Sequence, residues 1–109
     1  MPRFVEPQLS ANLTLVARFD ALAASAGITP AQLSLGWVLS RADHIVPIPG
    51  TTRIDHLEED LAAATLRIDP SVLDEVDALF PPNALSGPRY SAAMQAQIDT
   101  EALPGEALA

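Results

Sequence analysis

The apolar positions near the start of the chain recur at the spacing of an α-helix. From Ser10 onward the residues that recur at this helix-like spacing are Leu13, Val16, Ala17, Leu22 and Ala23. Gly27 follows these residues, at a position where glycine often ends a helix. The pattern therefore predicts a first helix that ends before Gly27, preceded by an extended lead-in over residues 1–9, which contains two prolines.

A second helix is predicted from its start signal. Thr29 and Gln32 have the spacing of a capping box, and Pro30 falls at the first helical position. The apolar residues that follow point to nearly every side of the helix, which predicts a helix covered on more than one face. We expect it to end near residues 41–43, with Trp37 as a core or interface anchor.

The apolar run over 44–50 is the clearest strand pattern in the chain. Residues 45–48 suit a strand buried on both faces of a parallel sheet, although Pro47 cannot donate a hydrogen bond to a neighbour. After it, Gly50 turns the chain, and Thr51 or Thr52 is expected to cap a further helix. The inner stripe of that helix comprises Leu57, Leu61 and Ala64.

The last third of the chain predicts two more helices. Asp69 and Pro70 form a cap followed by a first-turn proline, which opens a helix that ends before the prolines at 81–82. A loop rich in proline and glycine follows over 81–88, and 89–100 is expected to form a last short helix. Residues 101–109 are predicted to be a flexible tail.

The resulting fold class is mainly α with one short β-strand. A lone buried strand leaves its N–H and C=O groups without partners, so the helix–strand–helix order resembles a piece of a parallel α/β sheet. We therefore treat residues 1–109 as a single partial domain. Such a domain needs either more chain or a second copy to complete its hydrogen bonding.

Composition narrows the classes of partner. Hydrophobic residues make up 49% of the chain, and the formal net charge is -8. The acidic balance argues against nucleic acid and anionic membrane as partners, because phosphates require basic patches. With no cysteine and two histidines, we expect no metal site. No apolar run reaches membrane-spanning length and no signal peptide is evident, so a cytoplasmic location is expected.

The basic residues restrict the possible chemistry further. All six are arginines, and Tyr90 is the one tyrosine. This chain therefore has no lysine for a Schiff base, a P-loop or a tyrosine–lysine acid/base pair.

Two segments together are specific for one family. The stretch TPAQLSLGWVL at 29–39 resembles the TPAQxALxWxL helix of aldo-keto reductases. The stretches IVPIPGTTR at 45–53 and LEED at 57–60 resemble that family's IVPIPGTxR and LEEN segments. The resemblance covers about residues 3–100 and implies the last α-β-α part of a (β/α)8 TIM barrel, which is incomplete as a barrel.

The resemblance also implies where catalysis would occur. The family's catalytic aspartate, tyrosine, lysine and histidine lie on earlier barrel strands, and none of those positions has a counterpart in this chain. We therefore assign no catalytic residue, and we expect the chain to be inactive in carbonyl reduction when isolated. It would be an oxidoreductase fragment whose partner is the missing N-terminal portion of the barrel.

By the same resemblance, the segment after the strand binds the adenosine 2′-phosphate end of NADP(H). A helix N-terminus attracts anions, a glycine permits close backbone approach, and an arginine grips phosphate or stacks on adenine. The family's Glu-Asn pair is Glu59 and Asp60 here, and a carboxylate at position 60 cannot donate a hydrogen bond. The expected cofactor-binding residues are Pro49, Gly50, Thr51, Thr52, Arg53, His56, Glu59 and Asp60.

Other interpretations of the same residues stay open. Arg53 also fits an exposed arginine at a helix start, the threonines fit plain caps, and His56 fits a solvent-facing helix position. At the level of the whole chain, the alternative is a non-catalytic helical module that self-associates as a homodimer through the strand and the helix around Trp37. A third possibility is a nucleotide-binding module without chemistry.

Overall fold

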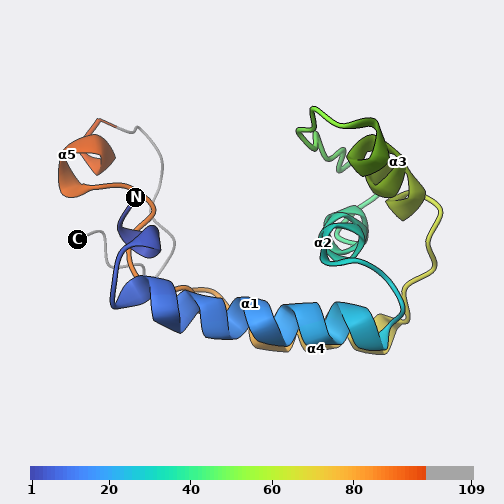
Figure 1. The fold of residues 1–109 in the computed structure, drawn as a ribbon, viewed down its shortest axis with the longest axis horizontal. Helices are drawn as coiled ribbons and strands as arrows, with labels where there is room; N and C mark the ends of the chain where they lie inside the picture. Colours follow the sequence, from blue (N-terminus) through green and yellow to red (C-terminus); the bar gives the residue numbers. More distant parts are fainter. Residues whose placement is uncertain (98–109) are drawn as a thin grey trace. The chain divides into compact units, whose positions relative to one another are not determined.

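The computed structural model describes residues 1–97, which form helices joined by irregular segments (Figure 1). A 3₁₀ helix, η1, precedes five α-helices, and no strand is assigned in this part of the chain. The mainly helical fold class, as an incomplete part of a barrel, is confirmed. The predicted tail at 101–109 and the end of the predicted last helix lie outside the described residues. The bounds are η1 Pro2–Phe4, α1 Gln8–Ser25, α2 Pro30–Leu39, α3 Ile54–Ala63, α4 Pro70–Leu79 and α5 Ala92–Gln95.

The chain divides into two compact units. The central unit comprises Arg18–Ala78, and the terminal unit comprises Met1–Ala17 with the chain from Leu79 onward. The sequence places one partial domain over 1–109, and its packing separates into these two units. The segment that carries the predicted cofactor residues lies wholly within the central unit.

α1 ends where the glycine predicts. Gly27 has a φ of +71°, the left-handed conformation that glycine adopts without steric cost. Its N–H donates to the Ala24 carbonyl at 3.1 Å, and the Ile28 N–H donates to the Ala23 carbonyl at 3.1 Å. These two bonds form a Schellman motif, which satisfies the last carbonyls of the helix and directs the chain toward α2.

The capping box at the start of α2 is formed as predicted. The Gln32 N–H donates to Thr29 Oγ1 at 3.2 Å, and the Thr29 N–H donates to Gln32 Oε1 at 3.1 Å. Pro30 takes the first helical position, where its missing N–H costs nothing. α2 ends at Leu39, slightly before the predicted end at residues 41–43.

Replacing Thr29 with alanine is expected to lower the free energy of unfolding by about 1 kcal/mol, because the Gln32 N–H at the helix start loses its acceptor, Thr29 Oγ1. Ser34→Ala is the matched control, since the exposed Ser34 hydroxyl only donates back to the Pro30 carbonyl. Urea unfolding followed by circular dichroism measures both variants. Equal losses for the two would contradict a capping role for Thr29.

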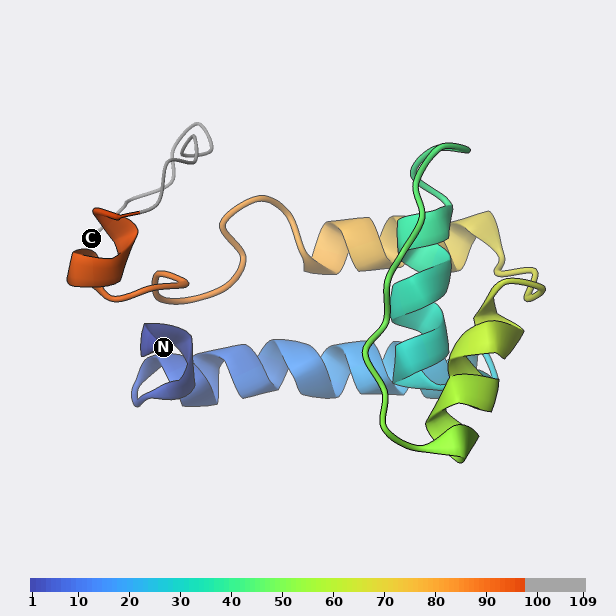
Figure 2. The same cartoon turned by 90° about the horizontal axis from the view of Figure 1, so that it is seen from above.

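The core of the central unit is small. Leu33 of α2 is 0% exposed and is the one large side chain that is fully buried among the described residues. The other buried hydrophobic side chains of this unit are smaller, namely Ala23, Ala63 and Val76. α2 packs against α3, and Figure 2 shows the two helices crossing at close range. Leu33 is therefore the most deeply buried large side chain among the described residues of this unit.

A polar cluster joins α2 to α4 within the central unit. Trp37 Nε1 donates to Asp77 Oδ1 at 2.8 Å, and Arg41 Nη1 donates to both carboxylate oxygens of Asp77 at 3.0 and 3.1 Å. The Arg41 guanidinium also lies 4.5 Å from the Trp37 ring centre, a cation–π distance. The hydrogen bond from Trp37 and then the Arg41 pair lower the pKa of Asp77.

This lowered pKa predicts an acid-dependent loss of stability. Because the folded state holds Asp77 ionised, its contribution is present above the ordinary aspartate pKa of about 3.9. It is lost as the pH falls through the lower folded-state pKa. Asp77→Asn is expected to flatten the fall in unfolding midpoint below about pH 4, measured by thermal melts across pH. Asp74→Asn removes the same charge from α4 and should leave that slope in place.

The predicted strand over 45–48 is not formed. Residues 45–50 have no regular secondary structure, and Figure 2 shows the segment running back along α2 toward α3. Val46 and Ile48 are 79% and 93% exposed. A strand is stabilised by hydrogen bonds to a neighbouring strand, and the part of the chain that the structure describes offers none beside it.

α4 begins and ends as predicted. Asp69 Oδ1 accepts hydrogen bonds from the Ser71 N–H and the Ser71 hydroxyl, both at 2.8 Å. These bonds lower the pKa of Asp69, the backbone bond having the larger effect. The helix ends at Leu79, just before the two prolines.

The terminal unit is held by polar bonds between the start of the chain and the loop after Ser86. Asn12 donates to the carbonyls of Arg3 and Ser86 at 3.2 and 3.0 Å, and accepts the Ser86 N–H at 2.7 Å. Arg3 Nε donates to the Gly87 carbonyl at 2.7 Å. The predicted extended lead-in is corrected here, because Pro2–Phe4 forms a 3₁₀ turn and α1 begins at Gln8.

By length and apolarity, no single helix within residues 1–97 could cross a membrane. α1 and α2 pass that test only when taken together, as a pair bent by 87°.

Candidate functional site

The turn before α3 is ordered by a threonine. Thr51 Oγ1 accepts the Arg53 N–H at 3.2 Å, and the Thr51 hydroxyl donates to the Arg53 carbonyl at 3.1 Å. The residue at the helix cap is Arg53, with no side-chain capping bond. The expectation that Thr51 or Thr52 caps α3 is therefore wrong, because the Thr51 hydroxyl reaches only two residues ahead and stops short of the first helical turn.

The residues ahead of this turn are open to solvent. Pro49, Gly50 and Thr52 are exposed, and Thr51 is half-buried. A Cβ placed on Gly50 would meet nothing within 4 Å in the described part of the chain. Packing among the described residues therefore does not require glycine at this position.

Arg53 is engaged by a neighbouring carboxylate. Its Nη2 donates to Asp55 Oδ2 at 2.6 Å, and its Nε donates to Asp55 Oδ1 at 3.0 Å. The side chains of Arg53 and Asp55 are 65% and 59% exposed. The pair raises the pKa of Arg53 and lowers the pKa of Asp55. Both groups are therefore ionised at neutral pH.

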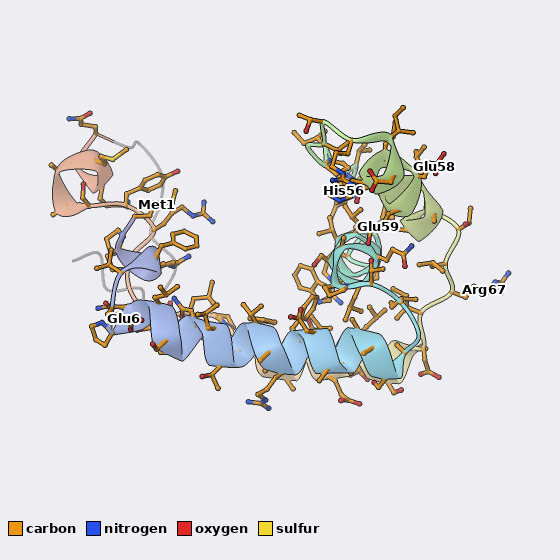
Figure 3. The ribbon with its side chains drawn as sticks, in the orientation of Figure 1. Met1, Glu6, His56, Glu58, Glu59 and Arg67 are labelled. Atoms are coloured by element: carbon orange, nitrogen blue, oxygen red, sulfur yellow. The ribbon has the colours of Figure 1, made fainter. Side chains whose placement is uncertain are left out.

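The other predicted site residues lie along α3. His56 is exposed, whereas Glu59 and Asp60 are half-buried, and Figure 3 shows Glu58 and Glu59 leaving the helix in different directions. The Glu59 carbonyl accepts a hydrogen bond from Gln32 Nε2 at 3.3 Å. Gln32 thus serves two purposes, since it completes the capping box of α2 and fixes α3 at the turn that bears Glu59.

The segment combines one cation with a strongly acidic surrounding. Residues 53–60 contain one arginine and four acidic residues, Asp55, Glu58, Glu59 and Asp60. The features that attract an anion are Arg53 and the start of α3, where the first-turn N–H groups have no capping side chain. The acidic residues oppose it, so any anion bound here must engage Arg53 directly.

The chemistry available is that of recognition. Arginine and backbone N–H groups bind phosphate, and carboxylates accept hydrogen bonds from amino groups such as that of adenine. No group of three or more histidine, aspartate or glutamate side chains in the described residues is placed to hold a metal ion. The arrangement can thus orient an anionic ligand, and we assign it no bond-making step.

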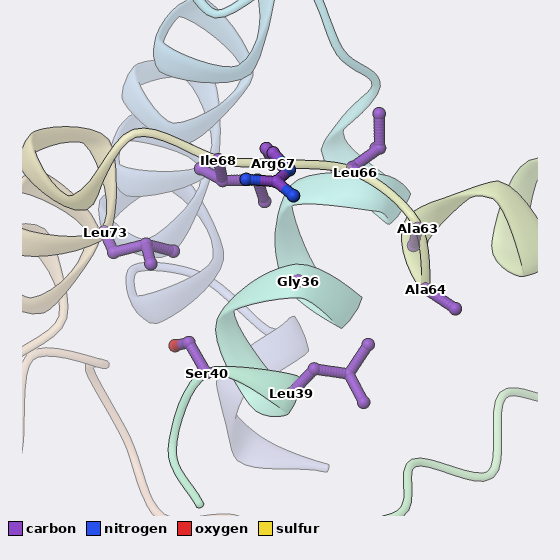
Figure 4. Close-up of a pocket in the computed structure, with 9 residues that line it drawn as sticks. All are labelled: Gly36, Leu39, Ser40, Ala63, Ala64, Leu66, Arg67, Ile68 and Leu73. Atoms are coloured by element: carbon purple, nitrogen blue, oxygen red, sulfur yellow. The ribbon is translucent and has the colours of Figure 1, made fainter. Parts of the chain in front are cut away.

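A separate hollow of about 400 Å³ lies between α2, the end of α3 and the connection to α4 (Figure 4). Its lining is largely aliphatic, and the Ser40 hydroxyl at its edge donates to the Trp37 carbonyl at 2.7 Å. None of the predicted cofactor residues contributes to it. Its lining residues are Gly36, Leu39, Ser40, Ala63, Ala64, Leu66, Arg67, Ile68 and Leu73.

Two participants in the site escaped the sequence analysis. Asp55 is not among the site residues that the sequence predicts, although an arginine and an aspartate two residues apart at a helix start can pair across the first turn. Gln32 was recognised as a capping residue only, and its bond to the Glu59 carbonyl depends on how α2 and α3 pack. The first had a local signal in the sequence, and the second had none.

Comparison with known proteins identifies the family. The model of the aldo/keto reductase family matches residues 2–80, which include the whole segment from Pro49 to Asp60. The chain belongs to the aldo/keto reductase family. This confirms the resemblance stated from the two sequence stretches at 29–39 and 45–60.

Two aldo/keto reductase relatives show how much of the family this chain represents. It is 34% identical over 105 residues to the yeast protein "Aldo-keto reductase yakc", named with NADP(+), of Schizosaccharomyces pombe, covering 94% of this chain and 31% of that protein. It is 37% identical over 89 residues to "Probable aldo-keto reductase 1" of Glycine max, covering 82% of this chain and 26% of that protein. The chain thus spans about a third or less of the relatives' length. No solved structure matches the chain.

Proposed function

We propose that this chain carries the segment of an NADP(H)-dependent aldo-keto reductase that binds the adenosine 2′-phosphate of the cofactor. The observation that carries the proposal is Arg53 at the uncapped start of α3, inside the part of the chain that matches the family. Within the proposal, Arg53 binds the phosphate, and Thr51 and Thr52 line the turn beside it. His56, Glu59 and Asp60 approach the adenine, and Pro49 and Gly50 shape the approach.

The chemical types of the residues in this segment suit a phosphate ligand. A 2′-phosphate is a dianion at neutral pH, and a guanidinium with free N–H groups beside a helix N-terminus is a good partner for it. The S. pombe relative has NADP(+) in its name, which supports the same cofactor here. Asp60 in place of the family's asparagine removes a donor near the adenine and adds a charge, so we propose weaker binding than an asparagine would give.

The chemistry of the complete reductases is proposed to lie outside this chain. By family resemblance, hydride passes from the nicotinamide to the carbonyl carbon of the substrate. The residues that catalyse this step lie on earlier barrel strands. We expect the isolated chain to reduce no carbonyl compound, and its contribution to be cofactor recognition. Consumption of NADPH with a panel of aldehydes, in a preparation free of host reductases, would contradict this.

Calorimetric titration of the purified chain with NADPH and with NADH tests the proposed function. We expect saturable heat with NADPH and much less with NADH, because only NADPH carries the 2′-phosphate. If neither cofactor gives heat, the result counts against binding by this chain. Equal heat with both would contradict recognition of the 2′-phosphate. A melting temperature that rises with NADPH concentration provides an independent readout.

Self-association as a homodimer is a second candidate, favoured by apolar side chains left in solvent. Val46, Ile48 and Ile54 are all more than three-quarters exposed along the segment that leads into α3. A second copy, or the N-terminal portion of a barrel, would remove this surface from water. Light scattering across a concentration series should show the mass of two chains if copies associate. A single-chain mass at the highest concentration would count against the homodimer.

A further inference from the structure

The cation of the proposed cofactor site already holds an anion supplied by the chain. Asp55 takes Nε and one N–H of Nη2 on Arg53, which is the side-on edge of the guanidinium. A carboxylate in this position satisfies two of the five N–H donors and neutralises the charge that would attract a phosphate. The inference below rests on the proposed function of this segment.

The location of Asp55 strengthens this competition. It lies in the first turn of α3, where a negative charge interacts favourably with the exposed N–H groups and the helix dipole. An incoming phosphate would use the same helix end. The carboxylate and the phosphate therefore compete for the guanidinium and for the helix N-terminus together.

The ion pair between Arg53 and Asp55 is also weak enough for another anion to displace the carboxylate. Both side chains are mostly exposed, and ion pairs in contact with water are weak because solvent screens them. A phosphate dianion carries more charge and more acceptor oxygens than the carboxylate it would displace. The arrangement therefore suits a counterion that holds Arg53 in the free protein and yields it to a stronger anion.

We propose that Asp55 is an internal counterion that competes with the cofactor 2′-phosphate for Arg53 and so limits the affinity for NADP(H). Asp55 acts through Arg53 and is not itself a ligand for the cofactor. Removing its charge frees the side-on edge of the guanidinium without changing the shape of the side chain. Affinity for the phosphorylated cofactor then rises, while affinity for NADH, which lacks the phosphate, stays the same.

The experiment compares Asp55→Asn with the parent chain by calorimetric titration with NADPH and NADH at low ionic strength. We expect up to about fivefold tighter binding of NADPH and no change for NADH, as suits the loss of an exposed ion pair. Added salt should reduce the gain, because screening weakens the competition in the parent chain. Glu58→Gln is the matched control, since it removes one charge from an exposed position on the same helix.

A double variant shows whether the gain passes through Arg53. When Arg53→Met and Asp55→Asn are combined, we expect Asp55→Asn to give no gain over Arg53→Met alone. A gain that persists there, or an equal gain with Glu58→Gln, would mean general charge reduction and would overturn the proposal. Weaker NADPH binding by Asp55→Asn would overturn it too, by showing that Asp55 orients Arg53 for binding. If neither the parent chain nor Asp55→Asn binds NADPH, the proposed function itself fails and this inference fails with it.

Discussion

Replacing Leu33 with alanine is expected to lower the free energy of unfolding by about 2–5 kcal/mol, a loss typical of a large buried side chain cut back to a methyl group. Leu33 is fully buried, and the other buried side chains of the central unit are small. The loss within this range depends on how far neighbouring side chains move in to fill the cavity left behind. Urea unfolding followed by circular dichroism should show a lower midpoint.

Leu61→Ala is the matched control for this variant. It makes the same chemical change on α3, at a side chain that is 64% exposed. We expect a change within about 0.5 kcal/mol, because little apolar surface returns to water there. Similar losses for the two variants would mean that Leu33 is not the centre of the packing, or that the exposed face of α3 is covered in solution.

Replacing Arg53 with methionine should weaken NADPH binding roughly tenfold or more, while NADH binding stays nearly unchanged. A hydrogen-bonded charge pair with phosphate contributes about 1.5–3 kcal/mol, which converts to that range of affinity. Methionine keeps the length of the side chain and removes its charge and donors. Calorimetry with both cofactors gives the ratio directly.

Arg67→Met is the control, because it changes the net charge by the same amount. Arg67 lies on the exposed connection between α3 and α4 (Figure 3). In the sequence this connection follows α3, whereas the turn at Thr51 precedes it. We expect it to bind NADPH like the parent chain. A parallel loss in both variants would indicate a general effect of charge, with no specific phosphate contact at Arg53.

The helices could be predicted from the sequence because their signals are local. The capping box of Thr29 and Gln32, the cap at Asp69 and the glycine at position 27 each act within a few residues, and each is formed. Whether residues 45–48 form a strand could not be predicted from local sequence in the same way. Its apolar side chains indicate that such a strand would be buried. The strand itself forms only beside a partner strand, which residues 1–97 do not provide.

The candidate site shows the same division. The family could be predicted from two stretches of sequence, and the assignment of residues 49–60 to a cofactor rests on that resemblance. The Thr51 and Arg53 backbone bonds and the Arg53–Asp55 pair required the geometry of the turn, which decides where each short side chain reaches. The roles of all eight predicted residues toward a cofactor stay predictions, to be tested by the titrations described above.

The two prolines of the exposed segment limit how it could assemble with other chains. In an extended chain, the N–H groups of residues 47 and 49 face one edge, and proline lacks that group at both positions. Residues 46 and 48 keep their donors on the opposite edge. A neighbouring strand therefore finds N–H donors on one edge, whereas the other edge offers it only the carbonyl acceptors of residues 47 and 49. Pairing through that second edge would be weaker, so the prolines lower the tendency of this apolar and exposed stretch to grow into fibrils.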